Sequence, residues 1–239
     1  MIEILEQLKD GILDALFPAA CASCGTEGTY ICATCQVFVS EAALACPVCQ
    51  DSSAFGTRHR HCEFSDALDG HVGVWEYEGV MRRLLSQIRE RGMTHAVSDL
   101  VKRALGVMAR DERFTEFFSF LLQLDISIVP VPMEITQEKK QGFSLAKVIA
   151  QELSGLLEKH YAPDVLLRTR RFEDALSREA RLQNPIGVFR YGTHDALAGA
   201  LLVDDFWMSG TTMQECCRVL KGSGVKEVWG FTLARATSF

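Results

Sequence analysis

Eight potential metal ligands occur as four closely spaced pairs, and this pattern constrains the fold more than any other feature of the 239-residue chain. Each pair has two residues between its members. The members are Cys21, Cys24, Cys32, Cys35, Cys46, Cys49, His59 and Cys62. A tetrahedral zinc ion takes four thiolates or imidazoles, and each such pair supplies two of them from one tight turn. The pattern therefore predicts two structural zinc ions, one bound by four cysteines and one by three cysteines and a histidine.

Two alternatives stay open within this cysteine-rich segment. Consecutive pairs would share an ion in two successive ribbons, whereas alternate pairs would form one cross-braced unit, and His61 could replace His59 as the imidazole ligand. Paired cysteines in a chain without a secretory signal favour metal ligation over disulfides. The two remaining cysteines of the nine, Cys216 and Cys217, lie far from the pairs, and we expect them in the core.

The uneven distribution of cysteines also predicts the domain organisation. An amphipathic helix is expected within residues 1–18, a zinc-binding module within 19–65 and one large domain within 66–239. No apolar run approaches the about 20 residues that cross a bilayer, and acidic residues interrupt the N-terminus, so we predict a cytoplasmic protein without a membrane span. The net charge of −6 argues against a uniformly basic nucleic-acid binder.

Strand and helix patterns alternate after residue 70. Strands are predicted at 71–77, 125–132, 165–167, 200–203 and 225–233, and helices at 80–91, 142–157 and 211–221. Gly92 is the expected C-cap of the first of these helices. Such alternation is typical of an α/β domain with a mostly parallel sheet flanked by helices.

The stretch from Ala200 to Thr212 carries the strongest functional pattern. An apolar strand is followed by Asp204 and Asp205, and then by a short turn that enters a helix. The turn offers backbone N–H groups, hydroxyls and the positive end of the helix to a phosphate group. Its residues are Met208, Ser209, Gly210, Thr211 and Thr212. The two carboxylates suit a sugar diol, bound directly or through Mg²⁺.

Two basic segments are expected to complete an anion site. Lys139 and Lys140 lie in a segment, 137–146, that we predict to be a loop entering a helix, where Gly142 allows the backbone to approach a pyrophosphate group. Arg178 and Arg181 belong to a charged segment that is either a helix or a loop able to fold over an anionic ligand.

These motifs resemble those of known families. Residues 200–212 resemble the phosphoribosyl-diphosphate (PRPP) binding signature of type I phosphoribosyltransferases. Together with the cysteine pairs, Tyr77-x-Gly79 and Val129-Pro-Val-Pro132, they resemble ComF-type competence proteins over nearly the whole chain. The resemblance implies a type I phosphoribosyltransferase-like fold behind a double zinc ribbon, with PRPP and Mg²⁺ bound at the acidic loop. It further implies a role in natural transformation and DNA uptake, with single-stranded DNA and uptake-machinery proteins as partners.

Several positions depart from the family pattern. Met208 stands where the family usually has Thr, Arg89 stands where it has Lys, and Gln141-Gly142-Phe143-Ser144 replaces Arg-Gly-Phe-Asn.

Two hypotheses of different class follow. In the first, the protein is a Mg²⁺-dependent phosphoribosyltransferase with an undetermined acceptor, in which Asp204 and Asp205 are catalytic and hold the ribose. In the second, it is a non-catalytic PRPP sensor or a scaffold that binds single-stranded DNA. In that case Trp75, Tyr77 and Trp207 would stack on bases.

Overall fold

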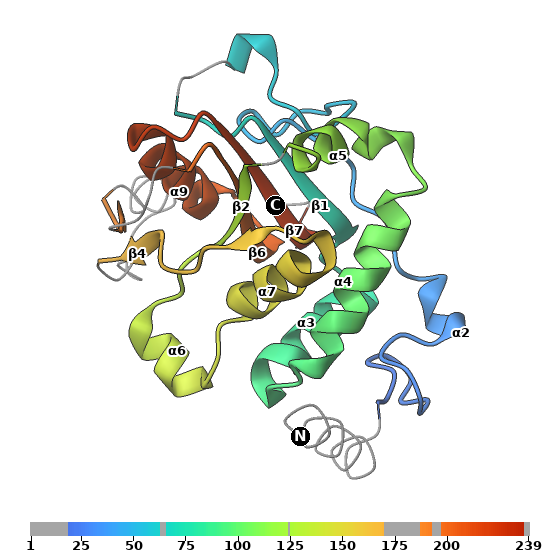
Figure 1. Ribbon diagram of the computed structural model, residues 1–239. Coiled ribbons are helices and arrows are strands. Elements are labelled where there is room, and N and C mark those ends of the chain that lie inside the picture. Colours follow the sequence, from blue (N-terminus) through green and yellow to red (C-terminus); the bar gives the residue numbers. More distant parts are fainter. Residues whose placement is uncertain (1–18, 63–65, 124, 170–186, 193–196, 237–239) are drawn as a thin grey trace.

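The computed structural model describes residues 19–62, 66–123, 125–169, 187–192 and 197–236. Its centre is a sheet of five strands in the order β1-β7-β6-β2-β3 (Figure 1). All neighbouring pairs in this sheet are parallel. The strands are β1 (Gly70–Glu76), β2 (Ile126–Pro130), β3 (His160–Tyr161), β6 (Gly199–Trp207) and β7 (Glu227–Arg235). A separate antiparallel pair joins β4 (Leu166–Arg168) to β5 (Phe189–Tyr191).

Helices cover both faces of the central sheet, as Figure 1 shows. One face packs against α3 (Gly79–Arg91), α4 (His95–Met108), α5 (Thr115–Leu121) and α7 (Leu145–Leu157). The other face packs against α9 (Thr211–Gly222) and the β4–β5 pair. The remaining short helices are α2 (Ala33–Gln36), α6 (Ile135–Gln141) and two 3-10 turns, η1 (Arg60–Cys62) and η2 (Glu112–Phe114). The predicted α/β class, with a mostly parallel sheet flanked by helices, is therefore confirmed.

The central strand β6 is apolar on both faces because each face meets a different helical layer. Leu201 and Val203 belong to the cluster that contains α3, α4 and α7. Ala200 and Leu202, which alternate with them, belong to the cluster that contains α9. Successive side chains of a strand point to opposite faces, so a continuous apolar run is what a doubly covered strand requires.

The cysteine-rich segment runs along β1, at the edge of the sheet. The Ala42 N–H donates to the Val74 carbonyl at 3.0 Å, and the Glu76 N–H donates to the Ser40 carbonyl at 2.9 Å. An exposed edge strand presents unpaired backbone groups, and this segment satisfies part of that edge. Tyr30 of the same segment is buried in the cluster that contains α3 and α4. The segment thus shares a hydrophobic core with the sheet.

Most elements predicted from local patterns are present in the structure. The helix predicted at 80–91 is α3, and Gly92 ends it in the left-handed region with φ 67°. The Gly92 N–H donates to the Ile88 carbonyl at 3.0 Å, as expected for a C-cap. Strands β3 and β5 and helix α5 were not predicted.

Two predicted boundaries near the expected site were wrong. Strand β6 continues to Trp207, four residues past the predicted end at residue 203, so Asp204 and Asp205 lie inside the strand. The reason is non-local, since β7 continues alongside β6 and pairs Phe206 with Ala234. The segment predicted as a loop before residue 142 is largely helix α6, and Gly142 ends that helix with φ 84°.

The amphipathic helix predicted before residue 19 lies outside the described residues. Among the helices that the structure does describe, none combines the length and the apolar character that a bilayer crossing requires.

Candidate metal centres and phosphate site

Two groups of potential metal ligands form within the described part of the cysteine-rich segment. The first group is Cys21, Cys24, Cys32 and Cys35, and in each group the ligand atoms lie within 4.8 Å of one another. The Cys24 and Cys32 sulfur atoms, for example, are 3.5 Å apart. Four thiolates about 2.3 Å from a zinc ion are about 3.8 Å from each other in a tetrahedron, so the group fits such an ion.

The second group is Cys46, Cys49, His59 and Cys62. The His59 Nδ1 atom lies 3.4 Å from the Cys49 sulfur, and its Nε2 atom lies 3.1 Å from the Ser52 carbonyl oxygen. A carbonyl only accepts hydrogen bonds, so Nε2 carries the proton and Nδ1 directs its lone pair into the group. A fixed tautomer of this kind is typical of metal-ligating histidines.

These groups resolve both alternatives that the sequence left open. Each group joins consecutive pairs, as in two successive ribbons, and alternate pairs do not meet in the described residues. His59 is the imidazole of the second group, whereas His61 is exposed and stacks on the His59 ring at 5.1 Å.

The surroundings shift the thiol pKa values in both directions within each group. Burial raises the pKa of Cys35 to about 12. For Cys49 the backbone N–H donor of Asp51 acts to lower the pKa, but burial and the Cys46 thiol outweigh it and raise the pKa to about 11. Burial acts to raise the pKa of Cys21, but backbone N–H donors from Cys24, Cys32 and Ser23 outweigh it and lower the pKa to about 6. The pKa of Cys46 is also lowered, because N–H donors from the backbone overcome the effect of burial. A lowered thiol pKa reduces the competition between protons and metal.

A pair of histidine substitutions tests the second metal centre. We expect the purified wild-type chain to contain two metal ions, His59→Ala about one, and His61→Ala two, because His61 supplies no ligand atom to either group. Elemental analysis by mass spectrometry gives the metal content of each variant. Loss of an ion from His61→Ala, with full metal content in His59→Ala, would contradict the assignment.

The acid pair lies at the carboxyl end of β6, and one member is held by an arginine. The Arg89 Nε atom donates to Asp205 Oδ2 at 2.5 Å, and a terminal nitrogen of Arg89 forms an ion pair with the same oxygen. The guanidinium carbon lies 4.5 Å from the ring centre of Phe206, which in turn stacks on Tyr77 at 4.5 Å. The Asp205 side chain of β6 is thereby held by α3, and the Phe206 ring that Arg89 covers is itself supported by Tyr77, directly after β1.

Asp204 has a different environment. Burial raises the pKa of Asp204 well above the usual carboxyl range, and the neighbouring Asp205 carboxylate adds to the shift. The Asp204 Oδ1 atom accepts the Asp205 N–H at 2.9 Å, and Asp204 lines the open cavity described below. The surroundings disfavour the ionised form of this carboxyl group. A cation or a hydrogen-bond donor that approaches it stabilises that form.

The turn between β6 and α9 is shaped by Trp207. Gly210 has φ 75°, and a Cβ atom at this position would lie 2.0 Å from Cζ2 of the Trp207 ring. The hydroxyl oxygens of Ser209 and Thr211 are 3.0 Å apart. The first N–H groups of a helix lack intrahelical acceptors, so this turn and the start of α9 offer several donors to an anion.

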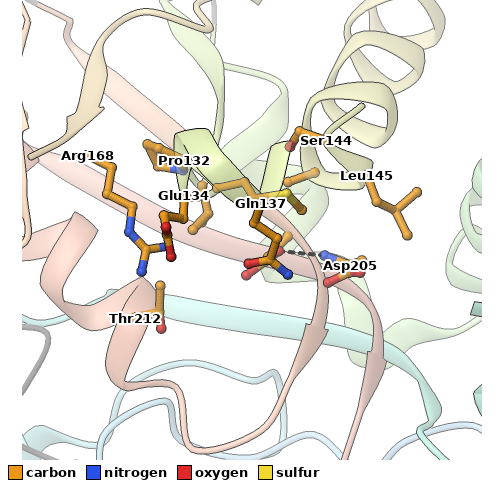
Figure 2. Close-up of a pocket in the computed structure, with 12 residues that line it drawn as sticks. Pro132, Glu134, Gln137, Ser144, Leu145, Arg168, Asp205 and Thr212 are labelled. Atoms are coloured by element: carbon orange, nitrogen blue, oxygen red, sulfur yellow. Dashed lines mark hydrogen bonds between the residues drawn. The ribbon is translucent and has the colours of Figure 1, made fainter. Parts of the chain in front are cut away.

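The acid pair and the start of α9 face one cavity of about 290 Å³. Its walls come from the β2–α6 connection, α6, the start of α7, β4, β6 and α9 (Figure 2). The lining residues are Val131, Pro132, Met133, Glu134, Gln137, Ser144, Leu145, Ala146, Arg168, Asp204, Asp205 and Thr212. The cavity therefore lies beyond the carboxyl ends of β2 and β6, where ligands of open α/β sheets bind.

Three polar residues of this cavity were not singled out from the sequence. Arg168 and Glu134 belong to no motif that the sequence showed, and Gln137 is only the first residue of the segment 137–146. Figure 2 shows the Arg168 side chain extending toward Glu134 and Thr212. Burial lowers the pKa of Arg168, yet a guanidinium stays charged at neutral pH, so Arg168 brings a cation to the cavity.

The structure places the predicted basic residues less centrally. Lys139 and Lys140 are exposed on α6, which contributes Gln137 to the cavity wall instead. Gly142 follows α6 and is exposed. Arg178 and Arg181 lie outside the described residues. A role for these five residues in anion binding stays a prediction. Cys216 and Cys217 are buried in α9, as expected.

Gly210 provides a test of the turn geometry. We expect Gly210→Ala to destabilise the fold more than Gly224→Ala, although both glycines have positive φ, because no atom lies within 4 Å of a Cβ at Gly224. The difference isolates the clash with Trp207 and should reach about 1–3 kcal/mol. Urea denaturation measures both changes, and equal destabilisation would show that Trp207 does not restrict the turn.

Asp204→Asn tests the burial of the acid pair. The pKa of Asp204 is raised in the fold, so ionised Asp204 costs stability as pH rises above the ordinary carboxyl value of about 4. We expect the variant to melt at a higher temperature than the wild type at pH 7, by about 2–4 °C for each kcal/mol relieved. The advantage should disappear near pH 4. Thermal melts across this range would contradict the assignment if the variant were less stable at pH 7.

Together, the fold and the two kinds of site define an α/β protein that has a candidate anion cavity and carries two candidate metal centres. The chain matches no family model. It is 28% identical over 139 residues to "Competence protein F" of Haemophilus influenzae, a match covering 56% of this chain and 59% of that protein. It is 24% identical over 191 residues to "Competence protein ComFC" of Bacillus subtilis, covering 79% of this chain and 72% of that protein.

The chain thus spans less than two thirds of the Haemophilus protein's length and somewhat more of the Bacillus protein's. Both relatives are named as competence proteins, in agreement with the family that the sequence motifs resemble. The two ligand groups fit a double zinc ribbon. The resemblance to ComF-type competence proteins is confirmed.

Proposed function

We propose that this chain is a PRPP-binding, phosphoribosyltransferase-like protein that acts in natural transformation. The observation that carries the proposal is the arrangement at the end of β6. Two carboxylates, a turn that has no room for a Cβ at Gly210, and the start of α9 follow each other along the chain, and both carboxylates and Thr212 line one cavity. The carboxylates come first along the chain and the N–H donors follow. A ligand that carries a sugar diol close to a phosphate group matches this order.

Each part of PRPP has a proposed partner. Asp205 is engaged by Arg89, so we assign the ribose hydroxyls and a bound Mg²⁺ to Asp204. The 5′-phosphate is assigned to the turn residues Met208 to Thr212 and to the N–H groups that begin α9. The pyrophosphate is assigned to the β2–α6 connection, with Lys139, Lys140 and Gly142 nearby and Arg178 and Arg181 closing over it.

The reaction that fits such a site is transfer of the phosphoribosyl group. An acceptor would attack the anomeric carbon, the bond from that carbon to the pyrophosphate oxygen would break, and pyrophosphate would leave with the electron pair. Mg²⁺ and the basic groups would stabilise the charge that develops on the leaving pyrophosphate. Asp204 would hold the ribose in the orientation needed for attack. The two ligand groups of the cysteine-rich segment are proposed to hold structural zinc.

The biological part of the proposal rests on the names of the relatives, both of which are competence proteins. We propose that the chain acts in DNA uptake, with uptake-machinery proteins and single-stranded DNA as partners. The hypothesis that Trp75 and Trp207 stack on bases does not hold, because their exposed fractions are only 3% and 2%. Tyr77 is half-buried and stacks on Phe206.

The double variant Asp204→Asn with Asp205→Asn tests PRPP binding. We expect calorimetry with Mg²⁺ to show an affinity reduced about tenfold or more, because charge-assisted contacts to the diol and the ion are lost. Metal content should stay at the wild-type value. Asp125→Asn, an exposed acid just before β2 at the opposite end of the sheet, is the matched control and should bind normally.

Unchanged affinity in the double variant would overturn the assigned site. An assay of pyrophosphate release with candidate acceptors then separates the two functional hypotheses. Release that depends on Mg²⁺ and an acceptor supports a transferase, whereas tight binding without release across acceptors supports a PRPP sensor or scaffold.

A further inference from the structure

The second metal group carries a glutamine whose conformation is set by the metal-binding turn. Gln50 directly follows Cys49, and its N–H donates to the Cys46 carbonyl at 3.0 Å, closing the turn between the two cysteines. Its φ of 67° is unusual for a residue other than glycine. The Gln50 side-chain nitrogen donates to the Pro47 carbonyl at 2.9 Å. Both ends of Gln50 are thus tied to the Cys46–Cys49 turn.

The remaining atom of this side chain contacts the end of β6. Gln50 Oε1 accepts the indole N–H of Trp207 at 3.2 Å and a terminal N–H of Arg235 at 2.6 Å. The Trp207 ring is buried and packs on the His71 ring at 4.0 Å. An acceptor shared by a buried indole and a buried guanidinium is costly to remove, because both donors would lose their partner.

Trp207 also sets the shape of the turn from Met208 to Thr212, to which we assigned the 5′-phosphate and which we call the phosphate turn. Gly210 passes so close to the indole that a Cβ there would overlap Cζ2. Any displacement of the ring therefore changes the space in which the turn from Met208 to Gly210 can lie.

A second contact joins the same metal-binding turn to the other side of the phosphate turn. The Gln214 side-chain nitrogen donates to the Pro47 carbonyl at 2.8 Å. The Gln214 N–H lies in the first turn of α9 and donates to the Gly210 carbonyl at 2.9 Å. The Cys46–Cys49 turn thus contacts the phosphate turn from Trp207 on one side and from Gln214 on the other.

The first metal group lies against a different part of the fold. Its contacts are to α3 and α4, for example from the Gln87 side-chain nitrogen to the Ala22 carbonyl at 3.3 Å. Its own Cys32–Cys35 turn is also followed by a glutamine, Gln36, whose N–H donates to the Cys32 carbonyl at 2.8 Å. Gln36 is exposed at the end of α2. The two glutamines are therefore matched in their place after a cysteine pair and in the N–H bond to the first cysteine's carbonyl, but not in φ or in their surroundings.

We propose that Gln50 is a positioning residue that couples the second metal group to the phosphate turn. This inference rests on the proposed function, since it assigns a role in PRPP binding to a residue that does not line the cavity. With the metal-binding turn closed, Gln50 holds the Trp207 indole, and the indole holds the Gly210 turn in the shape that receives a phosphate. Affinity for the ligand then depends on the second metal group.

The test compares Gln50→Ala, Gln50→Glu and Gln36→Ala in the full chain, after metal content has been checked. We expect Gln50→Ala to weaken PRPP binding in the presence of Mg²⁺ by about tenfold, the effect of a lost buried hydrogen bond. Gln50→Glu keeps an acceptor for the indole N–H and for Arg235 but loses the donor to the Pro47 carbonyl, so it should bind PRPP more tightly than Gln50→Ala and less tightly than the wild type. Gln36→Ala should bind as the wild type does.

A readout without ligand separates this inference from the proposed function. The indole N–H resonance of Trp207 in a ¹⁵N-labelled chain should shift in Gln50→Ala and stay unchanged in Gln36→Ala. An unshifted resonance overturns the coupling. A shifted resonance with wild-type PRPP affinity overturns the positioning role. Failure of the wild type itself to bind PRPP overturns the proposed function instead, and the resonance still decides whether Gln50 holds Trp207.

Discussion

Burial of β6 on both faces is the constraint on which the rest of the molecule depends. Leu201 and Val203 pack into one helical layer, and Ala200 and Leu202 pack into the other, so the strand is held from both sides. The residues that directly follow this apolar stretch are held in place with it. Asp204 and Asp205 therefore have fixed positions relative to the loops that follow β2. Functional side chains at the end of a rigid strand keep nearly constant distances to one another.

Two adjacent carboxylates at one strand end would repel each other if both were ionised. The fold gives the two side chains different surroundings. Asp205 is paired with Arg89, whose guanidinium also covers the Phe206 ring. Asp204 faces the cavity, and burial together with Asp205 raises its pKa. Asp205 is thus fixed by an ion pair with Arg89, and Asp204 is left without an ion pair to that arginine and lines the cavity. An arginine suits this task better than a lysine, because its flat guanidinium can pair with a carboxylate and stack on a ring together.

The parts of this molecule that sequence predicts well are those encoded by neighbouring residues. Ligand spacing identified the four ligand pairs but not which pairs share an ion, and apolar periodicity located α3 with its Gly92 cap. The end of β6 was missed because it depends on pairing with β7, at residues such as Ala234. Helix α6 was missed because it buries no residue, so it lacks an apolar stripe. Gln50 accepts a hydrogen bond from Trp207, which is 157 positions away in the sequence, and a local pattern does not encode such a contact.

The strand order also has a consequence for how the chain is made. β1 is the first strand along the described sequence, yet its partner in the sheet is β7, the last. During synthesis the cysteine-rich segment and β1 are made before the other strands of the sheet that the structure describes. β1 has no neighbour in the sheet until residue 235 has been made. The cysteine-rich segment covers the outer edge of β1, so the inner edge stays unpaired until β7 has been made. An unpaired strand edge can pair with other nascent chains, so the interval between the synthesis of β1 and that of β7 is when this chain is most open to wrong strand pairing.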